Sequence, residues 1–416
     1  MARRKVDHLL IGGGLAAANC ARWLREEGAD GSVLLVGREP DPPYNRPPLS
    51  KGYLRGEETR QQALFRPNEW WEEQDVELLT RTSVMKLDAG ERVATLSTKE
   101  EVEFATALLA TGANVRRLRA DGADLEGIHY LRAYGNSDAI RADAEAAERA
   151  VMIGGSYIGC EVAASLTASL GVKCTILMME DVTLERSFGP EIGGFFQGVL
   201  EEHGVEVVGG DELERFEGSD GRVQRVITKG GKSLDCDLVV VGAGVMPDVM
   251  LARSAGLELG ETGGVRCSSG LESSVAGVFA AGDICEYESP VHGHPLRVEH
   301  WDVAFNHGKT AALNMLGRGV EHETIPYFFS DLADWASMEY VGPGSGDVVV
   351  RGSPADGEFT AFFVGDEGVA AALSVGRSDD LEHARRLMAG RAQPNRAALS
   401  DLGTDLATLG QPAADT

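Results

Sequence analysis

The chain has 416 residues, 43% of them hydrophobic and 25% charged, so it can bury the cores of roughly two or three domains and has the composition of an ordinary folded protein. Its formal net charge of -26 at pH 7 argues against nonspecific binding to nucleic acid or to an anionic membrane. No run approaches the ~18 apolar residues of a membrane span, so we predict neither a membrane partner nor a nucleic-acid partner.

The N-terminal region is predicted to form a strand, a glycine-rich turn, a helix and a second strand. Residues 6–11 are mostly apolar, residues 16–27 carry apolar side chains at helical spacing, and residues 32–36 form a second apolar run. Glu39 follows the second strand. This order is typical of a unit that binds one half of a dinucleotide.

The glycine turn has the residues that such a unit needs. Gly12 permits the tight turn, Gly14 leaves room for a pyrophosphate, and Ala17 lets the helix pack closely on the strand. The helix N-terminus offers free N–H groups and dipole charge to phosphates. A glycine triplet alone could be only a tight turn, but here strand, turn, helix, strand and acid follow in the required order. The sequence therefore predicts a dinucleotide site at Gly12, Gly14, Leu15, Ala16, Ala17 and Glu39.

A proline-rich segment, PYNRPPLSKGYL, occupies residues 43–54. Its prolines exclude a helix or central strand before Leu49, so we expect a stiffened loop. The segment resembles a loop of the FAD-dependent pyridine nucleotide-disulfide oxidoreductase-fold family, in the branch of oxygenase-type ferredoxin reductases, monodehydroascorbate reductases and apoptosis-inducing-factor-like oxidoreductases. The resemblance implies that Arg46 contacts the FAD phosphates and ribose and that Lys51 lies beside the flavin ring. Without the preceding turn, a solvated basic loop would be the simpler interpretation.

An irregular region follows, with a short helix predicted near Trp70 and strands between residues 76 and 104. A third apolar run, residues 107–109, then leads into a Thr-Gly-Ala turn. Such a turn alone says little. The resemblance implies that it closes the first FAD-binding segment with Ala110, Thr111 and Gly112.

A second copy of the opening unit begins at residue 149. A strand at 149–153, a helix at 157–170 and a strand at 172–178 flank a GxGxxG-like turn in which Ser156 replaces the middle glycine. Two such units about 140 residues apart imply two dinucleotides. We assign FAD to the first and NAD(P) to the second, with its binding residues Gly154, Ser156, Tyr157, Ile158 and Gly159.

The acid after this unit favours NADH over NADPH. Aligned by residues 186–188, Glu180 matches the NAD-ribose glutamate of the ascorbate-radical and apoptosis-factor branches. No Arg or Lys lies between Met178 and Leu184, and we expect the next cation, Arg186, to lie beyond the reach of this turn.

Two residues of the second helix have alternative interpretations. Glu161, on an otherwise apolar helix, could be a structural partner for a buried cation. The resemblance instead pairs it with Lys51 beside the flavin, and makes Tyr157 the ring that covers the flavin until nicotinamide displaces it.

Later segments extend the resemblance. The turn at residues 242–247, with Gly244, resembles the return from the NAD domain to the FAD domain, and Gly282-Asp283 matches the turn whose aspartate binds the ribityl chain. A buried Trp alone would more simply be core. The match of RVEHWDVA, residues 297–304, assigns to the nicotinamide and flavin pocket the residues Glu299, His300 and Trp301.

The sequence after residue 326 predicts an α+β domain with strands at 347–351, 358–364 and 369–375 and a helix at 380–389. Residues 396–401 resemble the end of oxygenase-type ferredoxin reductases. The predicted fold is α/β, with two Rossmann-like dinucleotide-binding domains and this α+β domain. We place the first FAD segment at 1–115, the NAD domain at 116–245, the second FAD segment at 246–325 and the C-terminal domain at 326–416.

Six scattered cysteines form no Cys-x-x-Cys pair and lie mostly in apolar contexts, which favours reduced, buried thiols in a cytoplasmic protein. Disulfide reductases of this fold carry paired cysteines where this chain has PYNRPPLSK, so flavin must pass electrons directly to an acceptor. We predict no metal site. The resemblance assigns catalytic roles to Lys51, Glu161 and Trp301.

Three functions fit these predictions. An NADH-dependent reductase of a ferredoxin that serves an oxygenase or P450 ranks first, although an acidic partner requires a local basic patch. Reduction of a small radical or quinone ranks second, because Thr324 stands where the ascorbate branch has a tyrosine. An NADH-responsive sensor like the apoptosis-inducing factor ranks third. The oligomeric state, monomer or homodimer, is open.

Overall fold

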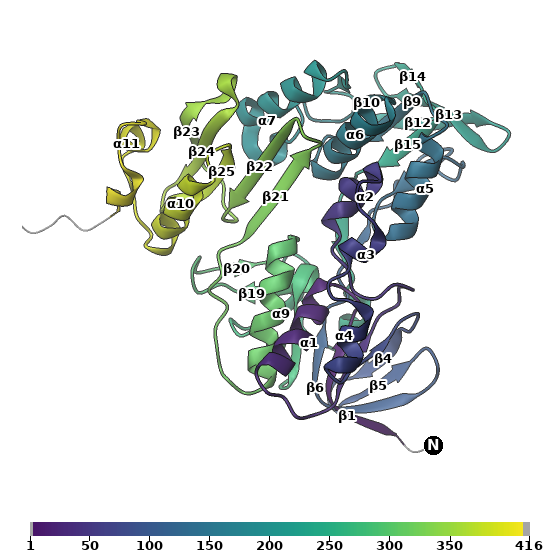
Figure 1. The fold of residues 1–416 in the computed structure, drawn as a ribbon, viewed down its shortest axis with the longest axis vertical. Helices are drawn as coiled ribbons and strands as arrows, with labels where there is room; N and C mark the ends of the chain where they lie inside the picture. The colour runs from purple at the N-terminus through teal and green to yellow at the C-terminus, as the bar shows by residue number, and fades with distance from the viewer. Residues whose placement is uncertain (1–2, 411–416) are drawn as a thin grey trace, which may run out of the picture. The chain divides into compact units, whose positions relative to one another are not determined.

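A computed structural model describes residues 3–410, which form two compact units (Figure 1). Unit 1 contains the described chain up to Asn45, Gln61–Asn114 and Val245–Tyr327, and unit 2 contains Arg46–Arg60, Val115–Gly244 and the described chain from Phe328 onward. Each unit therefore joins segments that are far apart in the sequence. The finer division into four segments stays a prediction. Within residues 3–410, no helix is both long and apolar enough to cross a membrane.

Unit 1 is built on a mixed sheet in which β3, β2, β1, β6 and β18 run parallel, while β5 and β4 extend it in antiparallel pairing. Residues 9–11, 33–36, 107–109 and 278–280 of the central parallel strands are apolar and buried, as expected for a sheet with both faces covered. Its principal strands and helices are β1 (Arg4–Ile11), α1 (Leu15–Glu26), β2 (Val33–Val36), α3 (Arg60–Ala63), α4 (Asn68–Glu73), β3 (Val76–Leu79), β4 (Val84–Asp88), β5 (Val93–Leu96), β6 (Glu101–Leu109), β7 (Ala113–Val115), β16 (Val245–Pro247), α8 (Met250–Ser254), β17 (Val265–Cys267), β18 (Val278–Ala280), β19 (Cys285–Glu288), β20 (Pro295–Leu296) and α9 (Trp301–Met315).

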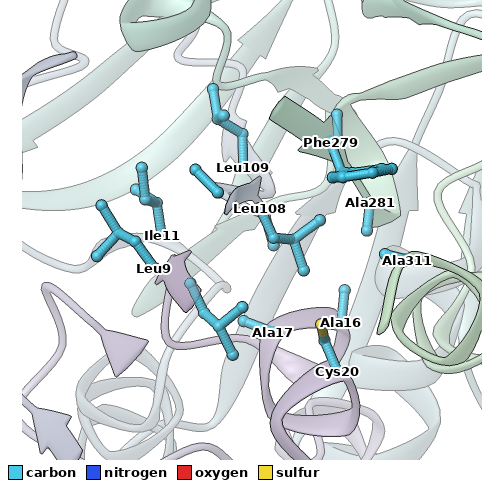
Figure 2. Close-up of a cluster of buried hydrophobic side chains, with 14 of the residues drawn as sticks. Leu9, Ile11, Ala16, Ala17, Cys20, Leu108, Leu109, Phe279, Ala281 and Ala311 are labelled. Carbon is cyan, nitrogen blue, oxygen red and sulfur yellow. The ribbon is translucent and has the colours of Figure 1, made fainter. Parts of the chain in front are cut away.

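Helices α1 and α9 pack against each other beside this sheet (Figure 1). A β-carbon at Gly308 of α9 would lie 2.5 Å from the carbonyl oxygen of Ala16, so only glycine permits this approach. The Asn19 side-chain amide donates to the carbonyl oxygen of Phe305 at 2.6 Å and ties the two helices together. Figure 2 shows small side chains of both helices, including Ala17 of α1 and Ala311 of α9, gathered around leucines from β1 and β6.

Unit 2 contains a second parallel sheet in the order β11-β10-β9-β15-β8. Helix α6 begins at Tyr157 and ends at Leu170, as predicted, and is followed by β10 at Lys173–Leu177. The remaining elements of this part are α2 (Gly52–Arg55), β8 (Ile128–Tyr130), α5 (Tyr134–Ala144), β9 (Arg149–Ile153), α7 (Glu185–Glu202), β11 (Glu206–Val208), β12 (Leu213–Ser219), β13 (Arg222–Thr228), β14 (Ser233–Asp235) and β15 (Leu238–Val241).

The C-terminal part of unit 2 is a five-stranded sheet in the order β21-β22-β25-β24-β23, with α10 packed on β25. Its elements are β21 (Tyr327–Leu332), β22 (Ala336–Val341), β23 (Asp347–Ser353), β24 (Glu358–Gly365), β25 (Gly368–Val375), α10 (Asp379–Ala389) and α11 (Arg396–Ser400). The sequence analysis predicted β23, β24, β25 and α10 but not β21 and β22. With the two parallel sheets, this domain confirms the predicted fold class.

An aromatic core makes the second parallel sheet and the C-terminal sheet one unit. Phe188 of α7 stacks on Phe328 of β21, with ring centroids 6.4 Å apart, and its ring also contacts Tyr340 and Phe363. Because these rings share one buried cluster, the C-terminal sheet is not a separate lobe of the chain.

Residues 46–60 join unit 2 because Leu54 of α2 is buried in the same cluster. The stiffened loop predicted here contains a short 3₁₀ helix, Pro47–Ser50, which the sequence analysis did not expect. Both prolines occupy its first two positions. A backbone N–H at these positions has no partner within the helix, so proline, which lacks one, is tolerated there.

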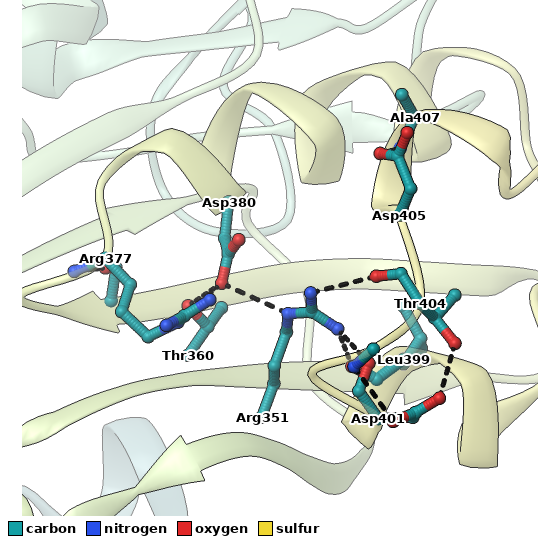
Figure 3. Close-up of polar contacts among 11 residues, drawn as sticks. Arg351, Thr360, Arg377, Asp380, Leu399, Asp401, Thr404, Asp405 and Ala407 are labelled. Carbon is teal, nitrogen blue, oxygen red and sulfur yellow. Dashed lines mark hydrogen bonds and ion pairs between the residues drawn. The ribbon is translucent and has the colours of Figure 1, made fainter.

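A buried arginine fastens the segment from Asp401 to Thr404 to the C-terminal sheet (Figure 3). The Arg351 guanidinium donates to the carbonyl oxygens of Asp401 at 2.6 Å and Thr404 at 3.0 Å. Its Nε lies 3.6 Å from the Asp380 carboxylate, which also pairs with Arg377 at 2.9 Å. The positive charge of Arg351 is thus balanced by the Asp380 carboxylate inside the fold.

We expect Arg351→Met to lower the free energy of unfolding of the C-terminal sheet by about 3 kcal/mol, because it removes a buried charge from its hydrogen-bond partners. The matched control is Arg396→Met, which breaks the exposed Arg396–Asp347 pair and should cost under about 1 kcal/mol. Hydrogen exchange at the amides of β24 and β25 measures both losses. Equal losses for the two variants would contradict a special role for the buried pair.

Candidate functional site

Four parallel strands of unit 1 end in register and bring the predicted residues of the first nucleotide site together. The N–H of Gly12 donates to Val36 of β2, and the N–H of Ala110 donates to Ile11 of β1, both at 2.8 Å. The N–H of Ala281 donates to Leu109 of β6 at 3.0 Å. The glycine turn, the Thr-Gly-Ala turn and the Gly-Asp turn therefore meet at the carboxyl edge of one sheet, where nucleotides bind in open α/β sheets.

The glycine turn fits a pyrophosphate. Gly12 has φ +127°, and a β-carbon there would lie 2.1 Å from the carbonyl oxygen of Ala110. A β-carbon at Gly14, in contrast, would meet no atom within 4 Å, so the packing of the protein does not require glycine at this position. Gly14 is the N-cap of α1 and has no side chain to cap it, so the first N–H groups of the helix lack an intrahelical partner and can donate to an anion. The negative charge of the two phosphates of FAD matches these donors and the positive end of the helix dipole.

Two further contacts organise this edge of unit 1. The buried Tyr44 hydroxyl donates to Oε2 of Glu39 at 2.6 Å and orients the carboxylate predicted to bind the ribose. The Thr111 hydroxyl donates to the carbonyl oxygen of Asp248 at 2.6 Å, and Gly112 has φ +71°. The sequence analysis assigned no role to Tyr44, although its place in the PYNRPPLSKGYL segment was a usable signal.

The Gly-Asp turn lies over the starts of α1 and α9. A β-carbon at Gly282 would lie 3.5 Å from the β-carbons of Ala16 and Ala304. Arg297 donates to the carbonyl oxygen of Asp283 at 3.1 Å and pairs with the Glu299 carboxylate at 2.5 Å. Glu299 is therefore tied to the turn through Arg297.

His300 and Trp301 stand at the N-terminus of α9. Burial lowers the pKa of His300 to about 4, so its imidazole is neutral near pH 7. The half-buried Trp301 donates its indole N–H to Oδ1 of Asn45 at 3.0 Å and stacks on Phe305 with ring centroids 5.3 Å apart. Asn45, which the sequence analysis did not single out, fixes the orientation of the indole.

In unit 2, Lys51 and Glu161 form the ion pair that the resemblance implied. The distance from Lys51 Nζ to Glu161 Oε1 is 2.7 Å, and the side chains are only 11% and 4% exposed. Hydroxyls of Ser50 and Ser330 each donate to a Glu161 oxygen at 2.5 Å, and Lys51 Nζ lies 5.7 Å from the Phe329 ring centre. The two serines, missed in the sequence analysis, satisfy a carboxylate that burial would otherwise disfavour.

The second glycine turn repeats the geometry of the first. Gly154 has φ +105°, and a β-carbon at Gly159 would lie 2.0 Å from the Gly154 carbonyl oxygen. Ser156 has φ -93° and ψ -171°, close to the -92° and -178° of Gly14, so serine does not disturb the turn. Ser156 is exposed and makes no side-chain cap, and Ile158 beside it is 38% exposed. A nucleotide pyrophosphate fits this helix N-terminus.

Three other residues of unit 2 that were predicted to bind a cofactor, Tyr157, Arg46 and Gly244, contact other parts of the same unit. Tyr157 packs against Phe328 and Phe188, at centroid distances of 4.9 Å and 6.0 Å, and burial raises its pKa to about 12. Its role as a movable cover stays a prediction. Arg46 donates to the carbonyl oxygen of Arg132, and Gly244 accepts from the N–H of Arg116 at 2.9 Å.

The expectation that Arg186 lies out of reach was wrong: its Nε pairs with Oε1 of Glu180. The reason is a sharp turn at Leu184, which has φ +57° and donates its N–H to Gly155 at 2.8 Å. This turn starts α7 beside the glycine loop and brings Arg186 back to the acid. The arginine is 73% exposed and the glutamate 21% exposed, so the cation covers a partly sheltered carboxylate.

All six cysteines are free and buried. Burial raises the pKa of the Cys174 and Cys236 thiols to about 12, which keeps them protonated. Residues 43–54 contain no cysteine. A thiolate relay therefore has no exposed cysteine to use among residues 3–410.

Two family profiles match the chain: "Pyridine nucleotide-disulphide oxidoreductase" over residues 6–308 and "Reductase C-terminal" over residues 327–410. A curated relative, the ferredoxin–NAD(+) reductase component of the anthranilate 1,2-dioxygenase system of Burkholderia cepacia, is 33% identical over 409 residues, which cover 96% of this chain and 98% of that protein.

Two solved structures are similar along nearly their whole length. The ferredoxin reductase for the CYP199A2 system from Rhodopseudomonas palustris gives a TM-score of 0.92 at 30% identity and covers 97% of this chain and 100% of that one. The covalent putidaredoxin reductase–putidaredoxin complex gives a TM-score of 0.91 at 28% identity and covers 98% of each chain.

The Glu180–Arg186 pair generates a prediction about nucleotide choice. We expect the wild type to prefer NADH, and Glu180→Gln to raise the relative use of NADPH about tenfold, because the released guanidinium can pair with a 2′-phosphate. Arg186→Gln should shift the preference further towards NADH, since the Glu180 charge is then uncovered.

The measurement is kcat/KM with NADH and NADPH, using ferricyanide as a common acceptor. The double variant Glu180→Gln with Arg186→Gln is the control and should fall between the single variants. An unchanged ratio in both single variants would mean that neither side chain faces the ribose.

Proposed function

Because this chain belongs to the pyridine nucleotide-disulphide oxidoreductase family and carries a reductase C-terminal domain, we propose that it is an NADH-dependent FAD reductase whose electron acceptor is a ferredoxin. The observation that carries the proposal is the full-length likeness to reductases named for ferredoxin in dioxygenase and CYP199A2 systems. We infer that the ferredoxin of this chain likewise serves an oxygenase or a P450.

The two nucleotide-binding turns support this assignment. The first takes the FAD pyrophosphate in the open space at Gly14, and the second takes NADH at Gly154, Ser156 and Gly159. FAD, when bound, accepts two electrons from NADH and releases them one at a time, which a one-electron carrier requires. The free, buried cysteines support direct transfer from the cofactor rather than through a disulfide.

We assign catalytic roles to Lys51, Glu161 and Trp301. Lys51 supplies a positive charge for the negative charge that the cofactor gains on reduction, and Glu161 with its two serine donors holds that cation in one position. Trp301, fixed by Asn45, borders the nicotinamide pocket. Asp283 binds the ribityl chain and Arg46 the phosphate and ribose side. The cytoplasmic location stays a prediction.

The test of the proposed function is acceptor choice. With saturating NADH, reduction of cytochrome c should rise and saturate with added [2Fe–2S] ferredoxin, while the ascorbate radical should be a poor acceptor because Thr324 lacks a phenol. Steady-state rates with ferredoxin, quinone and ascorbate radical decide the matter. Faster turnover with the radical or the quinone than with every ferredoxin tried would overturn the proposal in favour of a small-molecule reductase.

We expect Lys51→Met to slow flavin reduction by NADH at least about tenfold, because a preorganised charge is lost from the site. The control is Lys5→Met, which removes an exposed lysine paired with Glu103 and should leave the rate unchanged. Stopped-flow absorbance of the flavin follows the step. A wild-type rate in Lys51→Met protein of normal flavin content would restrict Lys51 to a structural role.

A further inference from the structure

Helix α9 carries a buried histidine that contacts the flavin turn of unit 1. His307 has no exposed surface, and its Nδ1 accepts the N–H of Gly282 at 3.2 Å. Because a backbone N–H can only donate, Nδ1 must be unprotonated, and the imidazole proton must reside on Nε2. Gly282 immediately precedes Asp283, the predicted ligand of the ribityl chain.

The surroundings of His307 keep it neutral. Its ring lies edge-to-face with Tyr287 and His322, at centroid distances of 4.9 Å and 4.5 Å. Burial and the neighbouring His322 hold the pKa of His307 well below its usual range. His322 is engaged elsewhere, since its Nδ1 lies 2.9 Å from the hydroxyl of Thr310, and burial lowers its pKa to about 4. The imidazolium form, in which Nδ1 is protonated and could not accept the Gly282 N–H, is therefore disfavoured by the packing.

The position of His307 is fixed by the residue beside it. Gly308 allows α9 to approach the backbone of α1 at Ala16, and the same Ala16 lies under the Gly282 turn. Helix α9, which packs on α1 at Ala16, therefore places the imidazole next to Gly282. Gly282 has φ +73°, a conformation that strains other residues, and it is itself buried away from water.

We propose that His307 is a positioning residue for FAD: by accepting the Gly282 N–H, it holds the Gly282–Asp283 turn in the conformation that presents Asp283 to the cofactor. Without this acceptor, the turn would have to bury an unpaired donor or change shape to expose it. The proposal rests on the proposed function only in taking FAD as the cofactor.

The test compares three variants by titrating apoprotein with FAD and following flavin fluorescence. His307→Phe keeps a ring but removes the acceptor, and it should raise the FAD Kd about tenfold or more. His307→Asn restores an acceptor oxygen near the position of Nδ1 and should recover most of the affinity. His322→Phe is the matched control, because it changes a ring of the same cluster without touching Gly282, and its Kd should stay within about twofold of the wild type.

A wild-type Kd for His307→Phe, or an equal loss in all three variants, would overturn the proposal and leave His307 as packing only. If His307→Phe does not fold, the imidazole ¹⁵N shifts of the wild-type holoprotein decide: unprotonated Nδ1 with protonated Nε2 supports the proposal, and the opposite tautomer refutes it. No electron acceptor enters these measurements. Failure to reduce ferredoxin would therefore leave the inference standing, whereas a wild type that binds no FAD would remove its premise.

Discussion

The alignment of strand ends is the constraint on which the rest of the structure depends. In unit 1, Ile11, Leu109 and Ala280 lie in register on adjacent parallel strands, so the turns that follow them open at one edge of the sheet. In unit 2, Ile153 and Leu177 do the same for the second glycine turn. A slip of one residue would reverse the side chains of a strand and displace its turn. The nucleotide sites are therefore a consequence of sheet register.

The buried Lys51–Glu161 ion pair of unit 2 depends on hydrogen bonds from residues that the fold brings together. Removing two charges from water is costly, and an ion pair repays that cost only when further hydrogen bonds satisfy the remaining oxygens. Ser50 and Ser330 supply those bonds, and they come from segments 280 residues apart in the sequence that share unit 2. The aromatic core around Phe188 keeps these segments in one unit, so core packing and site chemistry depend on each other.

The sequence was sufficient where the signal was local. Helix α6, the strands on either side of it, and both glycine turns could be predicted because period, glycine spacing and capping act within a few residues. The family, named from the PYNRPPLSKGYL segment, is confirmed by profiles that match residues 6–308 and 327–410. The 3₁₀ helix at Pro47–Ser50 was missed because prolines exclude most helices but are tolerated in a first turn.

Contacts that depend on a single backbone turn or on the approach of two helices were decided only by the tertiary structure. The pairing of Glu180 with Arg186 depends on a left-handed residue at Leu184 and its bond to Gly155, which no spacing rule encodes. The bond from Gly282 to His307 depends on how closely α9 approaches α1, and that distance is set by the absence of a side chain at Gly308. The sequence by itself thus determined which cofactors the chain is built to hold, since their motifs are local. Which side chains hold those motifs in place was decided by packing, because contacts set by one backbone turn or by the approach of two helices leave no periodic pattern in the sequence.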